Sequence, residues 1–200
     1  AIMRSARVWA DLERMGIPGI KGVYAHPAAA GGLGAIILSL QQMYAGHAPQ
    51  ALAIAAQSSG GAFFTKWIIA VEEDVDPTDM NDVLWALSTR CNPADDIDLL
   101  RQTWSTWLDP TQNPADERPW SSKALINACR EHRYLHVFST RTAIRKEMYE
   151  RVASRWDELG LDGSVPPVKA FYSDGDAKRH ALVEATELNK AAPAPVSISM

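Results

Sequence analysis

Cysteine is scarce in this sequence, since only Cys91 and Cys129 occur among the 200 residues. Two cysteines do not form the disulfide framework of a small secreted domain, so the composition favours a reducing, cytoplasmic compartment. No run of about 18 apolar residues occurs, so we expect no transmembrane helix and no membrane partner. Basic residues are not in excess. Against 20 Lys and Arg there are 24 Asp and Glu, and the net charge of −4 argues against a nucleic-acid partner.

The remaining composition is that of a folded globular protein. Hydrophobic residues make up 46% of the chain and charged residues 22%, which excludes a wholly disordered chain. A chain of this length suits one domain and can bury about 70% of its unfolded surface, enough to fold without a disulfide or a metal. No signal-peptide pattern occurs, and Ala1 already lies in sequence with a structured pattern. We therefore expect the chain to be a piece of a larger protein.

The hydrophobic pattern predicts an α/β fold. Residues 66–71 (KWIIAV) indicate a strand buried on both faces, because five apolar residues follow one another without alternation, as in a parallel sheet. Asp76 and Pro77 have the residue types of an N-cap and a first helical position, ahead of a helix that ends near Arg90. Further helices are predicted at 4–15, 35–44 and 48–57, and a strand at 20–25. This order predicts a mostly parallel sheet with flanking helices, a Rossmann-like layer.

Residues 91–120 are predicted to form an ordered but irregular loop. They contain four prolines, few periodic segments and three tryptophans: Trp104, Trp107 and Trp120. An irregular stretch of this length inside a domain is typical of a functional loop or of disorder. The three indole rings favour an ordered loop that packs against another surface.

Residues 141–159 have the clearest amphipathic helical pattern of the chain. The apolar positions of this face are Ile144, Met148, Val152 and Trp156. Such a helix either packs on its own domain or forms a subunit contact, and the sequence leaves both open. We therefore divide the chain into a domain at 1–138, a long C-terminal helix at 139–160 that we expect to form an oligomer interface, and a polar, mobile tail at 161–200.

Three patterns that could support chemistry also have plainer explanations. The glycine run at 31–34 (GGLG) could approach a nucleotide phosphate, but Ile37 stands where the dinucleotide motif needs a small residue, and a tight turn between a strand and a helix is the better explanation. The acidic run at 72–82 could hold a divalent cation, whereas strand exit and helix capping explain it without a calcium-type loop. His132 and His136 are four residues apart, but the glutamate that a zinc protease needs after the first histidine is missing.

Four segments of the chain together form a recognisable set. They are residues 42–48 (QMYAGHA), 64–76 (FTKWIIAVEEDVD), 81–90 (NDVLWALSTR) and 121–126 (SSKALI). In this order and spacing they resemble the UbiD family of reversible decarboxylases. The resemblance covers roughly residues 15–130 and corresponds to the C-terminal α/β domain of that family, with 141–159 as its terminal helix.

The resemblance implies a role within a larger enzyme. Family members bind prenylated FMN in a central domain with a divalent manganese or magnesium ion, and potassium is a further candidate ion. Their catalytic residues lie in that domain, so we expect this chain alone to hold no cofactor or metal and to be inactive. The full protein would be a carboxy-lyase acting on small aromatic or α,β-unsaturated carboxylic acids. The implied partners are further copies in a homo-oligomer, dimeric or built from dimers, and a flavin prenyltransferase that supplies the cofactor.

The resemblance also implies site residues. Family members close the substrate pocket with apolar residues of the loop that maps to Trp104, Trp107 and Leu108, and indole rings would give a dry, flat wall. The alternative is that these rings cover the domain's own core. Gly60 stands where some relatives carry a basic residue that touches the cofactor, and Lys66 matches a family lysine, so both are placed near the cofactor. A glycine at that place favours the alternative function, a non-catalytic assembly module that keeps the fold.

Overall fold

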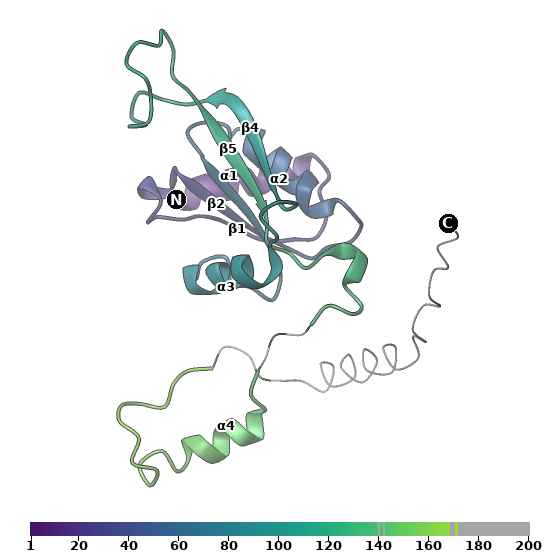
Figure 1. Ribbon diagram of the computed structural model, residues 1–200, viewed down its shortest axis with the longest axis vertical. Helices are drawn as coiled ribbons and strands as arrows, with labels where there is room; N and C mark the ends of the chain where they lie inside the picture. Colours follow the sequence, from purple (N-terminus) through teal and green to yellow (C-terminus); the bar gives the residue numbers. More distant parts are fainter. Residues whose placement is uncertain (140, 142, 169–170, 172–200) are drawn as a thin grey trace, which may run out of the picture. The chain divides into compact units, whose positions relative to one another are not determined.

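The computed structural model describes residues 1–139, 141, 143–168 and 171, and it divides into two compact units. Unit 1 spans Ala1–Arg133 and unit 2 spans Tyr134–Met200. Unit 1 contains the whole sheet, and the single helix of the described part of unit 2 is α4 (Figure 1). No helix in the described ranges is long and apolar enough to cross a membrane.

Unit 1 is built on one five-stranded sheet. Its strands are β1 (Ile20–Ala25), β2 (Ala35–Leu40), β3 (Trp67–Glu72), β4 (Ile97–Trp104) and β5 (Trp120–Asn127), in the order β1-β2-β3-β5-β4. The three central strands β2, β3 and β5 are parallel, whereas β1 and β4 pair antiparallel at the two edges. The predicted α/β class is confirmed, and the parallel character is restricted to the centre of the sheet.

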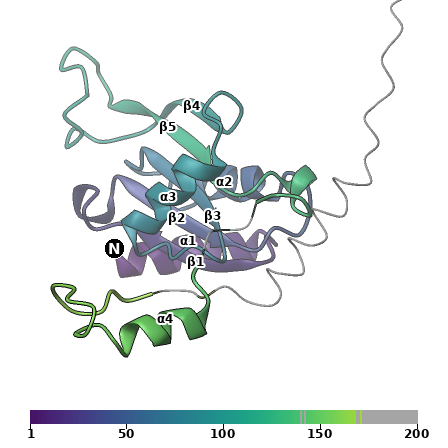
Figure 2. The same cartoon turned by 60° about the horizontal axis from the view of Figure 1, so that its bottom comes forward.

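Helices cover both faces of this sheet, and the alternation of side chains along β3 shows which face belongs to which helix. Ile68 packs in the core that includes α1 (Ile2–Arg14) and α2 (His47–Gln57). Ile69 points to the opposite face and packs in the core that includes α3 (Met80–Arg90). Figure 2 shows α3 on one side of the strands and α1 on the other. Unit 1 is therefore a three-layer arrangement with the sheet in the middle.

The prediction of a helix at 35–44 was wrong, because residues 35–40 form the central strand β2. All six residues of β2 are buried. A short apolar run that is buried on every side has no amphipathic period, so periodicity alone does not distinguish a buried strand from a buried helix. The correction also changes the setting of the glycine run at 31–34. That run connects two antiparallel strands instead of leading into a helix, so the phosphate-binding geometry expected of it is not formed.

Two boundaries also differ from the prediction. Helix α3 begins at Met80, because the side chain of Asp79 accepts a hydrogen bond from the Asn81 N–H at 2.9 Å, whereas Asp76 accepts one from the Thr78 N–H in the turn before. The predicted irregular loop at 91–120 contains all of β4, so the irregular part is reduced to 91–96 and 105–119. A bulge at Gln102, with a φ of 56°, interrupts the alternation of side chains along β4. The sequence pattern therefore did not indicate a strand here.

Unit 2 contains α4 (Lys146–Ala153), which is shorter than the helix predicted at 141–159. Turns follow it as far as Gly160. The segment after these turns returns to the helix, since Trp156 Nε1 donates to the carbonyl of Gly163 at 2.8 Å and Tyr149 Oη donates to that of Pro166 at 2.9 Å. The predicted mobile tail at 161–200 lies mostly outside the described residues.

Candidate functional site

The carboxyl end of the parallel strands, where ligands of α/β proteins usually bind, is closed by an ion cluster. Glu72, the last residue of β3, accepts hydrogen bonds from the Arg130 guanidinium at 2.5 and 3.1 Å and from Arg90 at 3.3 Å. Gln42 donates to the same carboxylate at 3.2 Å and to the Arg130 carbonyl at 2.8 Å. The cluster ties β3 to α3 and to the chain after β5, and it leaves Glu72 fully engaged.

The acidic run at 72–82, which could have held a cation, is engaged by arginine and by backbone amides. Arg90 binds Asp74 through two hydrogen bonds of 2.8 and 2.5 Å. Burial acts to raise the pKa of Asp74, but the hydrogen bonds and charge of Arg90 outweigh it and hold the pKa below its ordinary value. Among the described residues, no group of three or more His, Cys, Asp and Glu side chains is placed to hold a metal.

The opposite end of the sheet, where β3 begins, carries an unusual turn. Phe64 has a φ of 67°, which is rare for an aromatic residue and costs about 1–3 kcal/mol of backbone strain. The Thr65 N–H donates to the Phe63 carbonyl at 2.9 Å, and the Phe64 N–H donates to the carbonyl of Trp104, at the end of β4, at 3.3 Å. Strained backbone of this kind clusters at functional sites, so the turn marks this end of the sheet as the candidate site.

Lys66 follows this turn and binds a buried carboxylate in the 105–119 loop. Its Nζ lies 2.7 Å from Asp109 Oδ1 and 3.0 Å from Thr111 Oγ1, and Asp109 also accepts from the Thr111 N–H at 3.0 Å. Gln112 donates to Asp109 at 3.1 Å and accepts from the Trp120 N–H at 2.9 Å. Burial acts to raise the pKa of Asp109, but the hydrogen bond from Lys66 and those from the loop hold it far below its ordinary value. One carboxylate therefore connects β3, the loop and β5.

Large apolar side chains that are partly or largely exposed lie on the segments around this ion pair, which are the turn before Lys66, the end of β4, the 105–119 loop and the start of β5. We call them the aromatic edge: Phe63, Trp104, Trp107, Leu108 and Trp120. Phe63 and Trp104 meet edge to face with their centroids 5.1 Å apart, and Trp104 pairs with Trp120 across β4 and β5. Exposed fractions of 64% for Trp104, 52% for Trp107 and 78% for Leu108 show that these side chains do not fill the core of unit 1.

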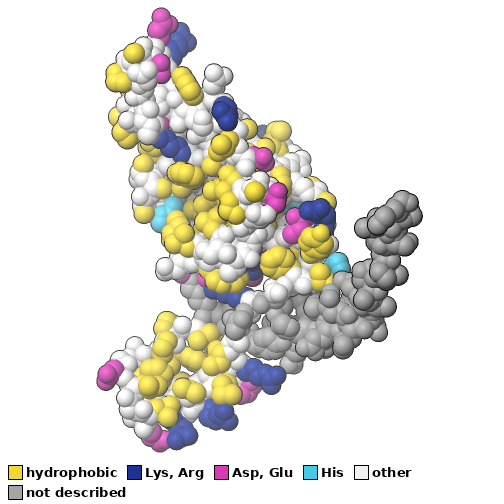
Figure 3. All heavy atoms as spheres, in the orientation of Figure 1, with side chains coloured by type: hydrophobic (Ala, Val, Ile, Leu, Met, Phe, Trp, Pro, Cys, Tyr) yellow, Lys and Arg dark blue, Asp and Glu magenta, His cyan; other side chains and the backbone are white. Residues whose placement is uncertain are grey.

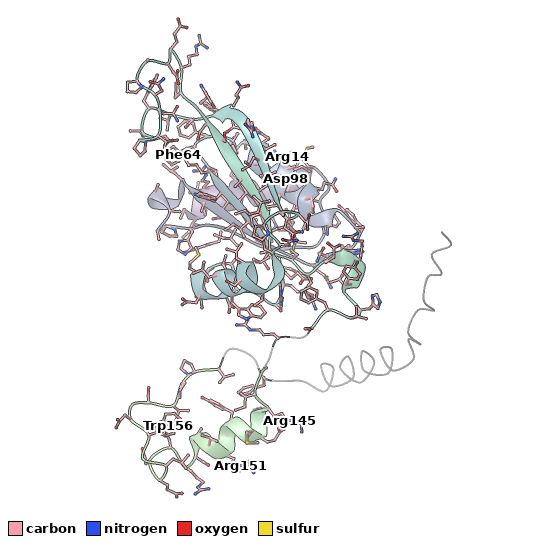
Figure 4. The ribbon with its side chains drawn as sticks, in the orientation of Figure 1. Arg14, Phe64, Asp98, Arg145, Arg151 and Trp156 are labelled. Carbon is pink, nitrogen blue, oxygen red and sulfur yellow. The ribbon has the colours of Figure 1, made fainter. Side chains whose placement is uncertain are left out.

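The figures show the setting of the aromatic edge. The connection between β4 and β5 projects beyond the sheet, with hydrophobic side chains along it and charged side chains at its tip (Figures 1 and 3). Phe64 lies at the same end of the sheet, near the base of this connection (Figure 4). The predicted residues Trp104, Trp107, Leu108 and Lys66 are thus brought to one end of unit 1.

Gly60, which the sequence predicts near the cofactor, packs against α1. A Cβ at this position would lie 2.7 Å from Val8 Cγ2 and 3.2 Å from the Val8 backbone nitrogen. The carbonyl of Gly60 accepts a hydrogen bond from Arg4 Nε at 2.7 Å. No basic side chain fits at position 60 without displacing α1.

The residues predicted for an oligomer interface lie in unit 2. Ile144, Val152 and Trp156 line a cavity of about 230 Å³ together with residues of the returning segment, such as Val165 and Pro166. Met148, the fourth predicted residue, is absent from that lining; its sulfur lies 2.9 Å from Arg151. The structure therefore brings three of the four together around one apolar cavity.

Sequence reasoning missed the residues that hold the candidate site. Asp109 stands in an irregular, proline-rich stretch where an acidic residue is expected to face solvent, although its side chain is buried. Lys123 belongs to a segment that supported the family resemblance, but nothing in the sequence indicates that its side chain is buried too. Arg4 is the third residue of this kind. A basic residue at the start of a helix gave no sign that it would bind a segment 56 to 61 residues away.

Comparison with known proteins defines the class. The family model described as the 3-octaprenyl-4-hydroxybenzoate carboxy-lyase C-terminal domain matches residues 1–128. Because this match covers more than half of the chain, the chain belongs to this family, the C-terminal domain of UbiD enzymes, and the predicted resemblance is confirmed.

Solved structures agree with this assignment. The chain is similar to the 3,4-dihydroxybenzoic acid decarboxylase of Klebsiella pneumoniae, with 26% identity and a TM-score of 0.63 over 80% of this chain and 32% of that one. It is similar to the vanillic acid decarboxylase of Sedimentibacter hydroxybenzoicus at 25% identity and a TM-score of 0.63, over 79% and 32%. The UbiD-class enzyme HmfF of Pelotomaculum thermopropionicum, solved with FMN, shares the fold at 22% identity and a TM-score of 0.63, over 72% and 30%. The chain spans about a third of the length of these enzymes.

The ion cluster predicts a large difference between two neighbouring glutamates. Glu72→Gln leaves two arginines without their buried carboxylate and should lower the free energy of unfolding by about 3–5 kcal/mol. Glu73→Gln removes only an exposed contact with Lys21 and should cost less than about 1 kcal/mol. Urea unfolding of both variants, followed by tryptophan fluorescence, measures the difference. Equal losses would contradict a closed ion cluster at this end of the sheet.

The Asp109 carboxylate predicts a pH dependence of stability. Since its pKa is depressed in the folded chain, its stabilisation is complete above the unfolded value of about 4 and is lost as the pH falls through the folded value. Asp109→Asn should lower the free energy of unfolding by about 1–3 kcal/mol at pH 7 and flatten the decline below pH 4. Unfolding curves between pH 7 and pH 2.5 test this, with the exposed loop residue Glu117→Gln as control. A wild-type decline in Asp109→Asn would refute it.

The packing of Gly60 predicts coupling with Val8. Gly60→Ala should cost about 1–3 kcal/mol because the new methyl group meets α1. Val8→Ala should cost a similar amount by leaving a cavity, about 1–3 kcal/mol. The double variant removes the clashing Cγ2 and should lose less than the sum of the two single losses, as measured by chemical denaturation. Strict additivity would show that the two positions do not touch.

Proposed function

We propose that this chain is the part of a UbiD-class carboxy-lyase that supplies one wall of the substrate pocket. The observation that carries the proposal is the aromatic edge, an exposed apolar surface beside the ion pair that Lys66 forms with the buried carboxylate of Asp109. Exposed indole rings fixed by buried charges are expected where another surface or a ligand covers them. The matched part covers 32% of each of these relatives, and in a full protein of this kind the preceding domains would provide that covering.

The aromatic edge suits an aromatic or α,β-unsaturated carboxylic acid as substrate. Flat indole faces such as those of Trp104 and Trp107 stack on planar ligands and exclude water from the carboxyl group. Excluding water strengthens the electrostatic interactions of the reacting carboxylate. The relatives at 25–26% identity are named for aromatic acids of this kind, vanillic and 3,4-dihydroxybenzoic acid.

The residues of this chain fit one side of a binding site for prenylated FMN. They do not form the whole site. The aromatic edge is an open surface, and Lys66 next to it forms an ion pair with Asp109. The cavities described in unit 1 lie elsewhere, one of about 340 Å³ along residues 16–20 and one of about 40 Å³ between α2 and β4. When bound, the flavin supplies an electron sink that stabilises the carbanion as CO₂ leaves. The flavin, a manganese or magnesium ion, and potassium would be held by other domains, and the isolated chain would be inactive.

Assembly completes the proposal. The apolar cavity beside α4 and the exposed Met148 make unit 2 the expected oligomer contact in a dimer or dimer-based assembly. A cytoplasmic flavin prenyltransferase would supply the cofactor. The second candidate function is a non-catalytic assembly module, which is favoured by Gly60, because this position lacks the basic side chain of some relatives.

The full-length parent protein, purified from cells that also make a flavin prenyltransferase, tests the proposal. It should retain a flavin absorbance band through gel filtration and release CO₂ from aromatic or unsaturated acids. In that protein Trp107→Ala should raise KM for the acid about tenfold while the flavin stays bound, because a stacking wall is lost. Leu84→Ala, an equally exposed apolar residue on α3, should leave KM unchanged.

Two results would contradict the proposal. A folded parent protein that stays colourless after reconstitution with the cofactor would support the assembly module instead. Turnover or tight flavin binding by the isolated 200-residue chain would show that the site does not need the other domains.

A further inference from the structure

Two cations, the half-buried Arg4 and the buried Lys123, hold the segment that leads into β3 from the side of the core. Arg4 of α1 donates to the carbonyls of Gly60 at 2.7 Å and Phe63 at 2.5 Å, and to Thr65 Oγ1 at 2.5 Å. Lys123 of β5 donates to the carbonyls of Ala62 at 2.8 Å, Thr65 at 2.7 Å and Gly61 at 3.4 Å. The carbonyls of five residues between 60 and 65 therefore converge on two side chains from distant parts of the sequence.

Lys123 is an unusual cation because its side chain is fully buried and, among the described residues, only carbonyl oxygens accept its hydrogen bonds. Its residue is 1% exposed, and its hydrogen-bond partners among the described residues are the three carbonyls. A buried ammonium normally requires a carboxylate, since removing the charge from water is costly. Three converging carbonyl oxygens match the three N–H donors of a lysine ammonium group.

The segment that Arg4 and Lys123 bind on its buried side positions residues of the candidate site on its exposed side. Its carbonyls point to Arg4 and Lys123, and this leaves the Phe64 N–H free to donate to Trp104 at 3.3 Å. The positive φ of Phe64 then places the Phe63 ring against the Trp104 ring and directs Lys66 to Asp109. A strained turn persists only where its surroundings determine it, and the two cations are those surroundings.

We propose that Lys123 is a positioning residue, whose three N–H groups fix the Phe63–Lys66 turn and thereby set the place of Phe63 and Lys66 at the aromatic edge. Its consequence for catalysis rests on the proposed function, but its effect on the turn does not. A neutral amine has two N–H groups for three carbonyls, so deprotonation releases one carbonyl and loosens the turn. The aromatic edge is therefore sensitive to pH through a residue that no substrate touches.

The pH range follows from the surroundings of Lys123. Burial lowers its pKa to about 8, and the positive charge of Arg4 acts in the same direction. The other charged groups of the adjacent elements are directed elsewhere: Lys66 binds Asp109, Asp11 of α1 binds Ser59 and Arg14, and Arg101 of β4 is exposed. The turn should thus loosen as the pH rises through about 8.

The stability of the whole unit should change in the opposite direction, which separates loosening from unfolding. Because the folded pKa of Lys123 is lower than the unfolded value of about 10.5, the unfolded chain keeps its proton to higher pH. Between these two values the unfolded state binds more protons, so this group's contribution to stability rises with pH. If the turn opens over the pH range in which this contribution to stability increases, the opening is local and is not caused by unfolding of the unit.

Hydrogen exchange of the 200-residue chain tests the proposal, with the protection factor of the Phe64 amide as readout. In the wild type this factor should fall about tenfold or more between pH 7 and pH 9, as one charged hydrogen bond is lost. Lys123→Met should show the low value already at pH 7 and no step, while Lys123→Arg keeps a cation and should restore protection at both pH values. Lys21→Met, an exposed lysine at the other end of the sheet, is the matched control and should behave as wild type.

Two outcomes would overturn the proposal: wild-type protection of the Phe64 amide in a folded Lys123→Met variant, or a pH step that persists in that variant. If Lys123→Met does not fold, NMR titration of the wild type decides. The Lys123 side-chain signal and the amides of residues 63–66 should then shift with one midpoint near pH 8. Amide signals of residues 63–66 that do not shift with the titration of Lys123 would overturn the proposal. None of these readouts needs the flavin or the other domains, so a failure of the proposed function leaves them unaffected.

Discussion

The aromatic edge depends on one ion pair, between Lys66 at the start of β3 and the buried carboxylate of Asp109. The 105–119 loop has no strand ladder to hold it, so its order comes from hydrogen bonds that converge on this carboxylate. Through Gln112 the same network reaches the first residue of β5. If either partner loses its charge, the loop loses the hydrogen-bonded carboxylate that keeps Trp107 and Leu108 in place.

The two ends of the sheet have different tasks. The carboxyl end is closed by Glu72, Arg90 and Arg130, whose contacts satisfy one another and hold β3, α3 and β5 together. The amino end is open, apolar and strained, and it is the end that a second surface can cover. In most α/β proteins the carboxyl end binds the ligand. In this domain that end is structural, which is consistent with a module that completes a site built mainly by other domains.

The sequence predicted the class of the fold, five elements of unit 1 and the family, because those depend on local signals. The buried strand near 66–71 and the helix that ends near Arg90 have strong patterns, and the motifs around them contain Gln42, Glu72 and Arg90 of the ion cluster. Strand β2 was mistaken for a helix because its burial on both faces removes any periodicity. The partners of Asp109 and Lys123 were beyond prediction, because 43 residues separate Lys66 from Asp109 and 58 separate Thr65 from Lys123. Such contacts depend on the packing of the whole unit, and no local sequence pattern indicates them.

The central claim is that the aromatic edge faces the reacting groups in the complete enzyme. A structure of the full-length parent protein with its flavin bound tests it most directly. The account predicts side-chain atoms of Trp104 or Trp107 within about 4.5 Å of the flavin or of a bound acid, which is the range of van der Waals contact. A bound flavin on the far side of the unit, with the aromatic edge still in solvent, would contradict it.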